Sequence, residues 1–274
     1  MRHLLLAFCA VLHLLHVQGQ DTNMTYELKD VAKKFLPPAY QARVIGGEVT
    51  TNEKLGGYLV ALRYYGDFIC GGTLIHDYFV VTAAHCFLGR SNKYQWTIEG
   101  GISTLDDTNG IKSEMKDYKV PLHFREDDMH MDVAVVQLRK PLKGHGVGKL
   151  KLCHTPLVAN LTLTVAGWGL VDTRSSQPHN YLRKADVPVM ARRECRRVYW
   201  PSVKLTDSMF CAALLGQKDA CTFDSGGPLA YKKQLCGIVS FGIGCASNKY
   251  PGVYTDVNYV KPFIKNAITS LNQS

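Results

Sequence analysis

Three segments that lie far apart in the chain carry side chains that together could activate a serine hydroxyl for attack on a carbonyl group. Ser225 lies between Asp224 and two glycines, in a tight turn that would present its oxygen. His85 precedes Cys86, which could clamp its loop, and Asp132 stands at the start of an apolar strand. A serine needs a base to take its proton, and histidine suits that task because its ordinary pKa lies near neutrality. A buried carboxylate would fix the imidazole tautomer and stabilise the imidazolium.

Each of the three residues has a less specific interpretation when it is considered alone. The chain has 10 histidines, and a histidine is more often structural than catalytic. Asp127 and Asp128 lie close to Asp132 and could be surface charges or could take its role. The occurrence of all three segments together favours a triad of His85, Asp132 and Ser225.

Short β-rich runs alternate with turn residues from Tyr58 onward, and there is no βαβ rhythm and no repeat of fixed period. This pattern predicts an all-β protein. Strands are expected at 58–64, 68–75, 78–82, 132–138, 161–167 and 234–241. A C-terminal helix is expected at about 259–271, because apolar residues recur there at helical spacing. Those residues are Val260, Phe263, Ile264, Ala267, Ile268 and Leu271.

The first residues of the chain are typical of an exported protein. Residues 1–19 combine a basic start, a short apolar run and small residues at the end, which predicts a signal peptide. That run is too short to span a membrane, so the mature protein is expected to be secreted and extracellular. Residues 20–43 are polar and mixed in charge, and are expected to form an activation propeptide ahead of a domain at 44–274.

Cysteine content and charge limit the classes of partner and cofactor. Nine cysteines are present, of which Cys9 would leave with the signal peptide, and the remaining eight predict four disulfides. There is no C-x-x-C pair and we expect no metal and no cofactor, although calcium dependence stays open. The formal net charge of +9 falls to about +7 without residues 1–43. The densest basic run, 192–197, is interpreted as a solvated turn; binding of acidic glycans or nucleic acid is the weaker alternative, and no nucleic-acid partner is expected.

The three segments and their order, His then Asp then Ser, resemble the chymotrypsin family of trypsin-like serine proteases. The resemblance extends over residues 44–274 and rests on Val81–Cys86, Met131–Val135 and Asp219–Tyr231. Within the family the chain is most similar to secreted insect trypsins, including those of seminal fluid. The resemblance implies two antiparallel six-stranded β-barrels at about 44–152 and 159–258, with the active site between them.

The family's activation site is also matched. Residues 41–47 resemble it, and cleavage after Arg43 would free the Val44 ammonium to pair with Asp224. Such a pair could order the surrounding loops only after cleavage, because a buried carboxylate without a partner is unfavourable. The resemblance therefore implies a zymogen that is activated by a trypsin-like protease, and another copy of this chain is one candidate. The alternative is a chance Arg–Val pair in a linker.

Four further residues correspond to the family's substrate-binding positions. Asp219, six residues before Ser225, would lie at the base of the primary pocket and select arginine or lysine. Gly242 and Gly252 would leave that pocket open, and the segment beginning at Ser240 would bind the substrate backbone as an added strand.

Three disulfides are implied by the resemblance, and a fourth follows by parity. The fourth would join Cys153 to Cys236, and its alternative is a bond to a partner chain. The four pairs are Cys70–Cys86, Cys195–Cys211, Cys221–Cys245 and Cys153–Cys236.

Phe223 is the departure from the family's pattern that bears most on activity. It stands where the family has a glycine whose backbone N–H, with that of Ser225, forms the oxyanion hole. A phenylalanine keeps this N–H but is strained at positive φ. Either the ring narrows the cleft, or the oxyanion hole is collapsed until a preferred substrate reorganises it.

The expected function is cleavage after Arg or Lys, by limited proteolysis of selected extracellular or seminal-fluid proteins. The alternatives are a catalytically silent homologue that binds partners through the same cleft, and a broad digestive trypsin. A monomer that meets protein inhibitors is expected. Asn160 is the expected glycosylation site, because it begins the sequon Asn160-Leu161-Thr162.

Overall fold

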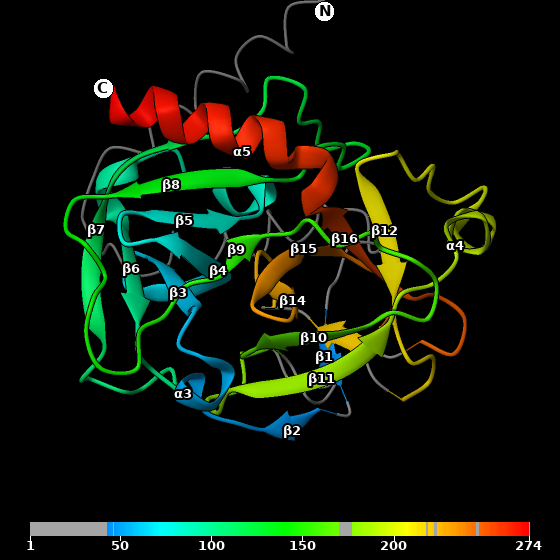
Figure 1. Cartoon of the computed structure of the whole chain (residues 1–274), viewed down its shortest axis with the longest axis horizontal. Coiled ribbons are helices and arrows are strands. Elements are labelled where there is room, and N and C mark those ends of the chain that lie inside the picture. The colour runs from blue at the N-terminus through cyan, green and yellow to red at the C-terminus, as the bar shows by residue number, and fades with distance from the viewer. Residues whose placement is uncertain are drawn as a thin grey trace, which may run out of the picture. The chain divides into compact units, whose positions relative to one another are not determined.

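The first half of the protein folds into a closed six-stranded barrel. The computed structural model describes residues 43–45, 47–169, 177–217, 219–221, 224–244 and 247–273. The barrel strands are β3 (Leu59–Tyr64), β4 (Asp67–His76), β5 (Phe79–Thr82), β6 (Trp96–Gly100), β7 (Ile111–Lys119) and β8 (Ala134–Leu138). They follow the antiparallel order β3-β4-β5-β8-β7-β6, and β6 pairs with β3 to close the ring (Figure 1).

The second half is a curved antiparallel sheet that also returns on itself. Its main strands are β10 (Thr162–Gly167), β11 (Arg183–Pro188), β12 (Met209–Ala212), β14 (Pro228–Tyr231), β15 (Gln234–Phe241) and β16 (Gly252–Asp256). They run in the order β12-β16-β15-β14-β10-β11. An isolated bridge between Val189 and Ala212 joins the two ends, and the Met190 N–H donates to the Cys211 carbonyl at 2.8 Å. The all-β prediction is confirmed, and the second ring closes through this bridge rather than through a full ladder.

Short elements connect and border the two halves. A two-stranded sheet pairs β1 (Arg43–Ile45) with β13 (Asp219–Cys221), and β2 (Glu48–Val49) extends the second sheet beside β11. The segment between the barrels contains β9 (Lys151–Leu152), which pairs in parallel with β15. The remaining short elements are α3 (Asn52–Leu55), η1 (Ala84–Phe87), η2 (Lys93–Gln95) and α4 (Arg192–Tyr199).

The C-terminal helix α5 (Val257–Asn272) packs against strands of both halves. It begins where the Asp256 carboxylate caps the Asn258 N–H at 2.9 Å. Its buried face carries the expected apolar positions, including Val260, Ile264 and Leu271. The helix lies along β8 and also contacts β15 (Figure 1). Burial of one apolar stripe therefore holds the two barrels against a common element.

The basic run at 192–197 forms a helix, so its interpretation as a turn was wrong. Cys195 and Tyr199 lie four residues apart and are both buried, which gives α4 an apolar face. Arginine and glutamate are good helix formers, so the charged positions between them favour the helix as well. No helix within the described residues is long and apolar enough to cross a membrane.

Candidate active site

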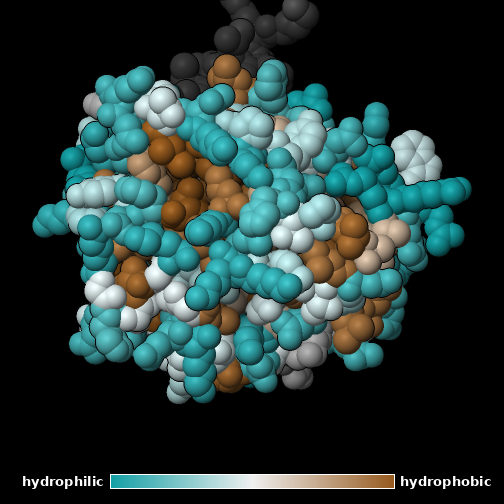
Figure 2. All heavy atoms as spheres, viewed as in Figure 1, coloured by the Kyte–Doolittle hydropathy of each residue, from teal (hydrophilic) through white to brown (hydrophobic). Residues whose placement is uncertain are grey.

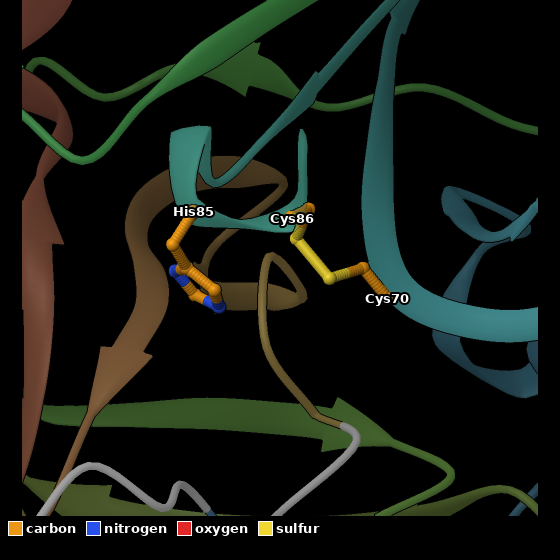
Figure 3. Close-up of side chains that lie close together, drawn as sticks. All are labelled: Cys70, His85 and Cys86. Carbon is orange, nitrogen blue, oxygen red and sulfur yellow. A yellow bond between two sulfur atoms is a disulfide. The ribbon is translucent and has the colours of Figure 1, made fainter. Parts of the chain in front are cut away.

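His85 is held on a short turn that a disulfide fixes to the first barrel. The turn η1 follows β5 directly, and Cys86 within it is bonded to Cys70 of β4. Figure 3 shows the imidazole projecting from this turn beside the bridge. The side chain of His85 keeps 19% of its surface exposed, so one edge of the ring remains accessible. Cys70, His85 and Cys86 lie close enough to suggest metal ligands, but both sulfurs are used in the disulfide.

Asp132 is completely buried and bonded to His85 twice. One carboxylate oxygen, Oδ1, accepts the backbone N–H of His85 at 3.0 Å, and Oδ2 lies 2.8 Å from the ring Nδ1. Because an ionised carboxylate only accepts hydrogen bonds, Nδ1 must carry the proton of the neutral ring. The other nitrogen, Nε2, is then left with a free lone pair and can act as a base.

The acid is also tied to the second barrel. The Ser240 hydroxyl of β15 donates to Asp132 Oδ2 at 2.5 Å, and the Thr255 hydroxyl of β16 donates to the Asp132 carbonyl at 2.8 Å. Burial by itself would raise the pKa of Asp132. The electrostatic interaction with His85 and the hydrogen bonds from His85 and Ser240 outweigh it, so the pKa lies below its ordinary value. The carboxylate is therefore ionised at neutral pH.

The two neighbouring acids have other partners. Asp128 pairs with Arg125 and accepts the His130 backbone N–H, while Asp127 is exposed beside the same arginine. Of these three acids, Asp132 is thus the one whose carboxylate contacts His85.

Ser225 reaches the same region through its backbone. The Gly71 N–H of β4 donates to the Ser225 carbonyl at 2.9 Å, and the Gly226 N–H donates to the Val239 carbonyl of β15 at 2.9 Å. Gly71 directly follows Cys70, which is bonded to Cys86 in the His85 turn. The two backbone bonds therefore place the Ser225 turn next to the strand that anchors the His85 turn. Among the described residues, no hydrogen bond joins the Ser225 hydroxyl to His85.

Gly226 explains why the turn can approach so closely. Its φ is +76°, and a Cβ at this position would lie 2.1 Å from Thr82 Oγ1 and 2.6 Å from the Gly71 carbonyl oxygen. Both the backbone angle and the lack of space require glycine here. The Ser225 turn therefore packs directly on the strands that carry the His85 turn.

Asp224 is completely buried between two glycines at the end of β10. The Gly169 N–H donates to its Oδ1 at 2.8 Å. A Cβ on Gly167 would lie 2.0 Å from Oδ1, and one on Gly169 would lie 2.1 Å from Oδ2. Sequence reasoning missed this contact, although the two closely spaced glycines of Gly167-Trp168-Gly169 were a visible signal.

The remaining expected site residues are only partly described. The backbone of β1 pairs with that of β13, so Val44 lies opposite Ala220, and Ile45 opposite Asp219. Gly242 and Gly252 are buried near the ends of β15 and β16. The side chains of Arg43, Val44, Asp219 and Cys221, and all of Phe223 and Cys245, lie outside the described residues. The expected Cys221–Cys245 bridge therefore stays a prediction.

The structure forms the other three expected bridges. They are Cys70–Cys86, Cys153–Cys236 and Cys195–Cys211. The second ties the segment between the barrels to β15, and the third ties α4 to β12. Asn160 is exposed in a turn, with its backbone N–H donating to the Val189 carbonyl at 2.8 Å.

Comparison with known proteins agrees with this geometry. The sequence profile of the family described as Trypsin matches residues 44–264. The chain belongs to the trypsin family. It is therefore a trypsin-like serine endopeptidase, a hydrolase of peptide bonds.

Relatives in two insects and one solved structure show how closely this trypsin resembles known members. Seminase of Drosophila melanogaster is 54% identical over 271 residues, covering 99% of this chain and 98% of that protein. The vitellin-degrading protease of Bombyx mori is 35% identical, covering 85% and 89%. Neuropsin, a serine protease expressed in the limbic system of mouse brain, superposes with a TM-score of 0.75 at 27% identity, covering 82% of this chain and 99% of that one. The expected resemblance to the family, and to an insect trypsin such as seminase, is confirmed.

Proposed function

We propose that this protein is a secreted protease, made as a zymogen, that cleaves selected proteins after arginine or lysine. The observation that carries the proposal is the buried Asp132–His85 pair, with the Ser225 turn packed on the strands that hold it. In the proposed mechanism His85 Nε2 takes the Ser225 proton as the hydroxyl attacks the scissile carbonyl, and returns it to the leaving amine. Asp132 holds the ring and stabilises its charged form. The backbone N–H groups of Phe223 and Ser225 would bind the oxyanion.

Activation would act through Asp224. Cleavage after Arg43 would create the Val44 ammonium, and the paired backbones of β1 and β13 support a route that brings this terminus to the nucleophile half of the site. The buried carboxylate of Asp224 would pair with the new ammonium. We expect the Asp219 strand and the Ser225 turn to take their active positions together for this reason.

Cleavage of the purified chain after Arg43 tests the proposal. Hydrolysis of small arginine and lysine esters should appear only after the cut, and a Ser225→Ala variant cut in the same way should lose it. An ester of phenylalanine serves as the control for specificity, and it should react far more slowly if Asp219 lies at the base of the primary pocket. A folded, correctly cut protein without serine-dependent turnover would instead support a silent homologue that binds partners through the cleft.

Limited proteolysis is preferred to broad digestion because of Phe223. If the ring narrows the leaving-group side of the cleft, rigid inhibitors and bulky peptides are excluded there. If the oxyanion donor points away instead, the loss is about 3 kcal/mol, or about a hundredfold in rate. Under both hypotheses Phe223→Gly should raise general peptidase activity and sensitivity to protein inhibitors. If Phe223→Gly changed neither peptidase activity nor inhibitor sensitivity, Phe223 would give no reason to expect a narrow range of substrates.

Selected extracellular proteins, including those of seminal fluid, are the proposed substrates. The support is the 54% identity to seminase. Export through residues 1–19, a monomeric state, protein inhibitors as partners and a glycan on Asn160 complete the proposal. Mass spectrometry of the secreted protein would check the mature N-terminus and the Asn160 glycan in one measurement.

A further inference from the structure

A basic cavity lies beside α4, apart from the residues assigned to catalysis. Its volume is about 710 Å³. Five of its lining residues are always or nearly always cationic, and Asp207 is the one acid among the described residues that line it. The five are Arg125, Arg193, Arg196, Arg197 and Lys204. Arg125 pairs with Asp128 and Arg196 with Asp207, so the excess of positive charge comes from the other three cations.

The helix presents these charges on one face. Arg196 and Arg197 lie three and four residues after Arg193, which places the three arginines on one side of α4, and Trp200 follows as the C-cap residue. The opposite side is buried, and the Cys195–Cys211 disulfide fixes it to β12. Figure 2 shows hydrophilic side chains projecting from the right-hand edge, where α4 lies in Figure 1, with hydrophobic side chains below them. The basic face is thus held outward on a rigid element.

Structural roles do not account for three of the cations. Arg192, on another side of α4, does have such a role, because it bonds to the Asp207 and Met209 carbonyls and to Asp256. Within the described part of the chain, Arg193, Arg197 and Lys204 form no ion pair. Like charges four residues apart disfavour a helix, so the pair Arg193–Arg197 opposes the stability of α4. An anion bound between them would relieve that repulsion.

Two exposed aromatic rings border the same cavity. Trp200 is 68% exposed and Tyr259 is 45% exposed. An aromatic ring can pack against an apolar face of a ligand, while the neighbouring cations bind its anionic groups. The cavity therefore suits a ligand in which apolar ring faces and anionic groups alternate. Sugar rings offer C–H faces for such packing, and sulfo groups match the forked geometry of guanidinium groups.

We propose that this cavity binds a sulfated polysaccharide. The cations surround a recess rather than follow an extended groove, which favours clustered sulfo groups over a nucleic-acid backbone. Anion binding in the cavity does not depend on where the protein is located. The choice of an extracellular polyanion as the ligand rests on the proposed export of the protein. The basic net charge of the chain adds long-range attraction for any polyanion, so the test must separate the cavity from the overall charge.

The test measures binding of a fluorescent heparin oligosaccharide to the purified full-length chain over a series of salt concentrations. Arg193→Glu/Arg197→Glu should weaken binding about a hundredfold and flatten the dependence on salt. Lys140→Glu/Lys265→Glu is the matched control, because it changes the net charge equally at two exposed lysines outside the cavity. The control should weaken binding by less than about threefold. Trp200→Ala should weaken binding without changing the salt slope.

Several results would overturn the proposal. Equal losses in the arginine pair and the lysine pair would show attraction by net charge alone. Binding of desulfated heparin as tightly as heparin would exclude sulfo recognition, and tighter binding of single-stranded DNA of similar length would assign the cavity to nucleic acid. Arg193→Gln/Arg197→Gln repeats the test if the charge reversal prevents folding, as judged by thermal unfolding. Ser225→Ala should bind heparin like the unaltered chain, so failure of the protease proposal leaves this test intact.

Discussion

The two halves of the candidate active site are held by different kinds of interaction. The acid–base half is built from side chains, since Asp132 is buried under bonds from His85, Ser240 and Thr255. The nucleophile half is built from backbone, since Ser225 is positioned through main-chain bonds and the packing of Gly226. The first can be weakened one hydrogen bond at a time, whereas the second depends on the position of a whole turn.

This difference indicates where the proposed activation should act. The His85–Asp132 pair is already complete in the uncleaved chain, at 2.8 Å between Nδ1 and Oδ2. Ser225 makes no hydrogen bond to His85 among the described residues of that chain. Cleavage after Arg43 is therefore expected to change the nucleophile half and to leave the acid–base half as it is. Substitutions in each half should reveal this separation.

The largest effect is expected from Asp132→Asn. The amide cannot hold the imidazole in the same tautomer, and kcat should fall by about 10⁴, the value known for this substitution in the family. Thermal unfolding should change far less than activity, because the side chain keeps its shape. Ester hydrolysis after cleavage measures the loss, with Asp128→Asn as the control for a nearby acid that does not contact His85. A comparable loss from Asp128→Asn would contradict the assignment.

The next largest effect is expected from Gly226→Ala. The new methyl group would meet Thr82 and the Gly71 carbonyl, so the turn must shift and Ser225 with it. A displacement of about 1 Å in a catalytic group costs on the order of a hundredfold in rate, and the required shift here is larger, so we expect about a thousandfold. The measurement is kcat/KM for an arginine ester.

Gly89→Ala is the matched control for that substitution. Gly89 has a φ of +69°, close to that of Gly226, but a Cβ there would have no neighbour within 4 Å. It should lower the free energy of unfolding by about 1–2 kcal/mol through backbone strain and leave activity unchanged. If both variants lost activity alike, strain rather than packing would explain the need for glycine at 226.

A smaller effect is expected from Gly169→Ala, which should act only on activation. Its Cβ would overlap the Asp224 carboxylate, so the acid could not occupy its buried position. Loss of a buried charge pair worth about 3 kcal/mol would lower the active fraction about a hundredfold. Activity before and after cleavage is compared in the same preparation. A variant that is activated normally would show that Asp224 has no role in the response to cleavage.

The sequence predicts the acid–base half better than the surroundings of the nucleophile. Strands with strong apolar patterns, such as 58–64 and 234–241, correspond to β3 and β15. The expected set omitted six of the barrel strands, which are β6, β7, β11, β12, β14 and β16. Pairing with strands distant in the chain places these segments in the barrels, and no local pattern marked them. The bond from Thr255 to Asp132 was missed for the same reason. Long-range register brings those two residues together, and no local sequence feature shows it.

The basic run at 192–197 illustrates the opposite error. Its charges were visible, but the two buried residues that make it a helix, Cys195 and Tyr199, were not weighed with them. Their spacing of four residues was the available signal. A charged run should therefore be examined for buried positions before it is assigned to a turn.

The smallest effect is expected from Ser240→Ala. This substitution tests the acid–base half alone, because it removes one hydrogen bond to Asp132 and does not displace the Ser225 turn. The hydroxyl donates to ionised Asp132, so its loss should raise the pKa of Asp132 towards the ordinary value. A hydrogen bond to a charged group contributes about 1.5 kcal/mol at the lower end, or about tenfold in kcat. Ser240→Thr keeps the hydroxyl and should restore most of that activity.

The pH dependence gives this substitution a readout that a purely structural role would not move. Because the pKa of Asp132 is lowered in the folded protein, its ionised form contributes stability at pH values above the ordinary carboxyl pKa. That contribution is lost as pH falls through the folded value. In Ser240→Ala, thermal unfolding should show a smaller contribution from the ionised carboxylate, and that contribution should be fully lost at a higher pH. The same dependence of thermal unfolding on pH as in the unaltered protein, with activity reduced equally at every pH, would show that Ser240 acts on the substrate rather than on Asp132.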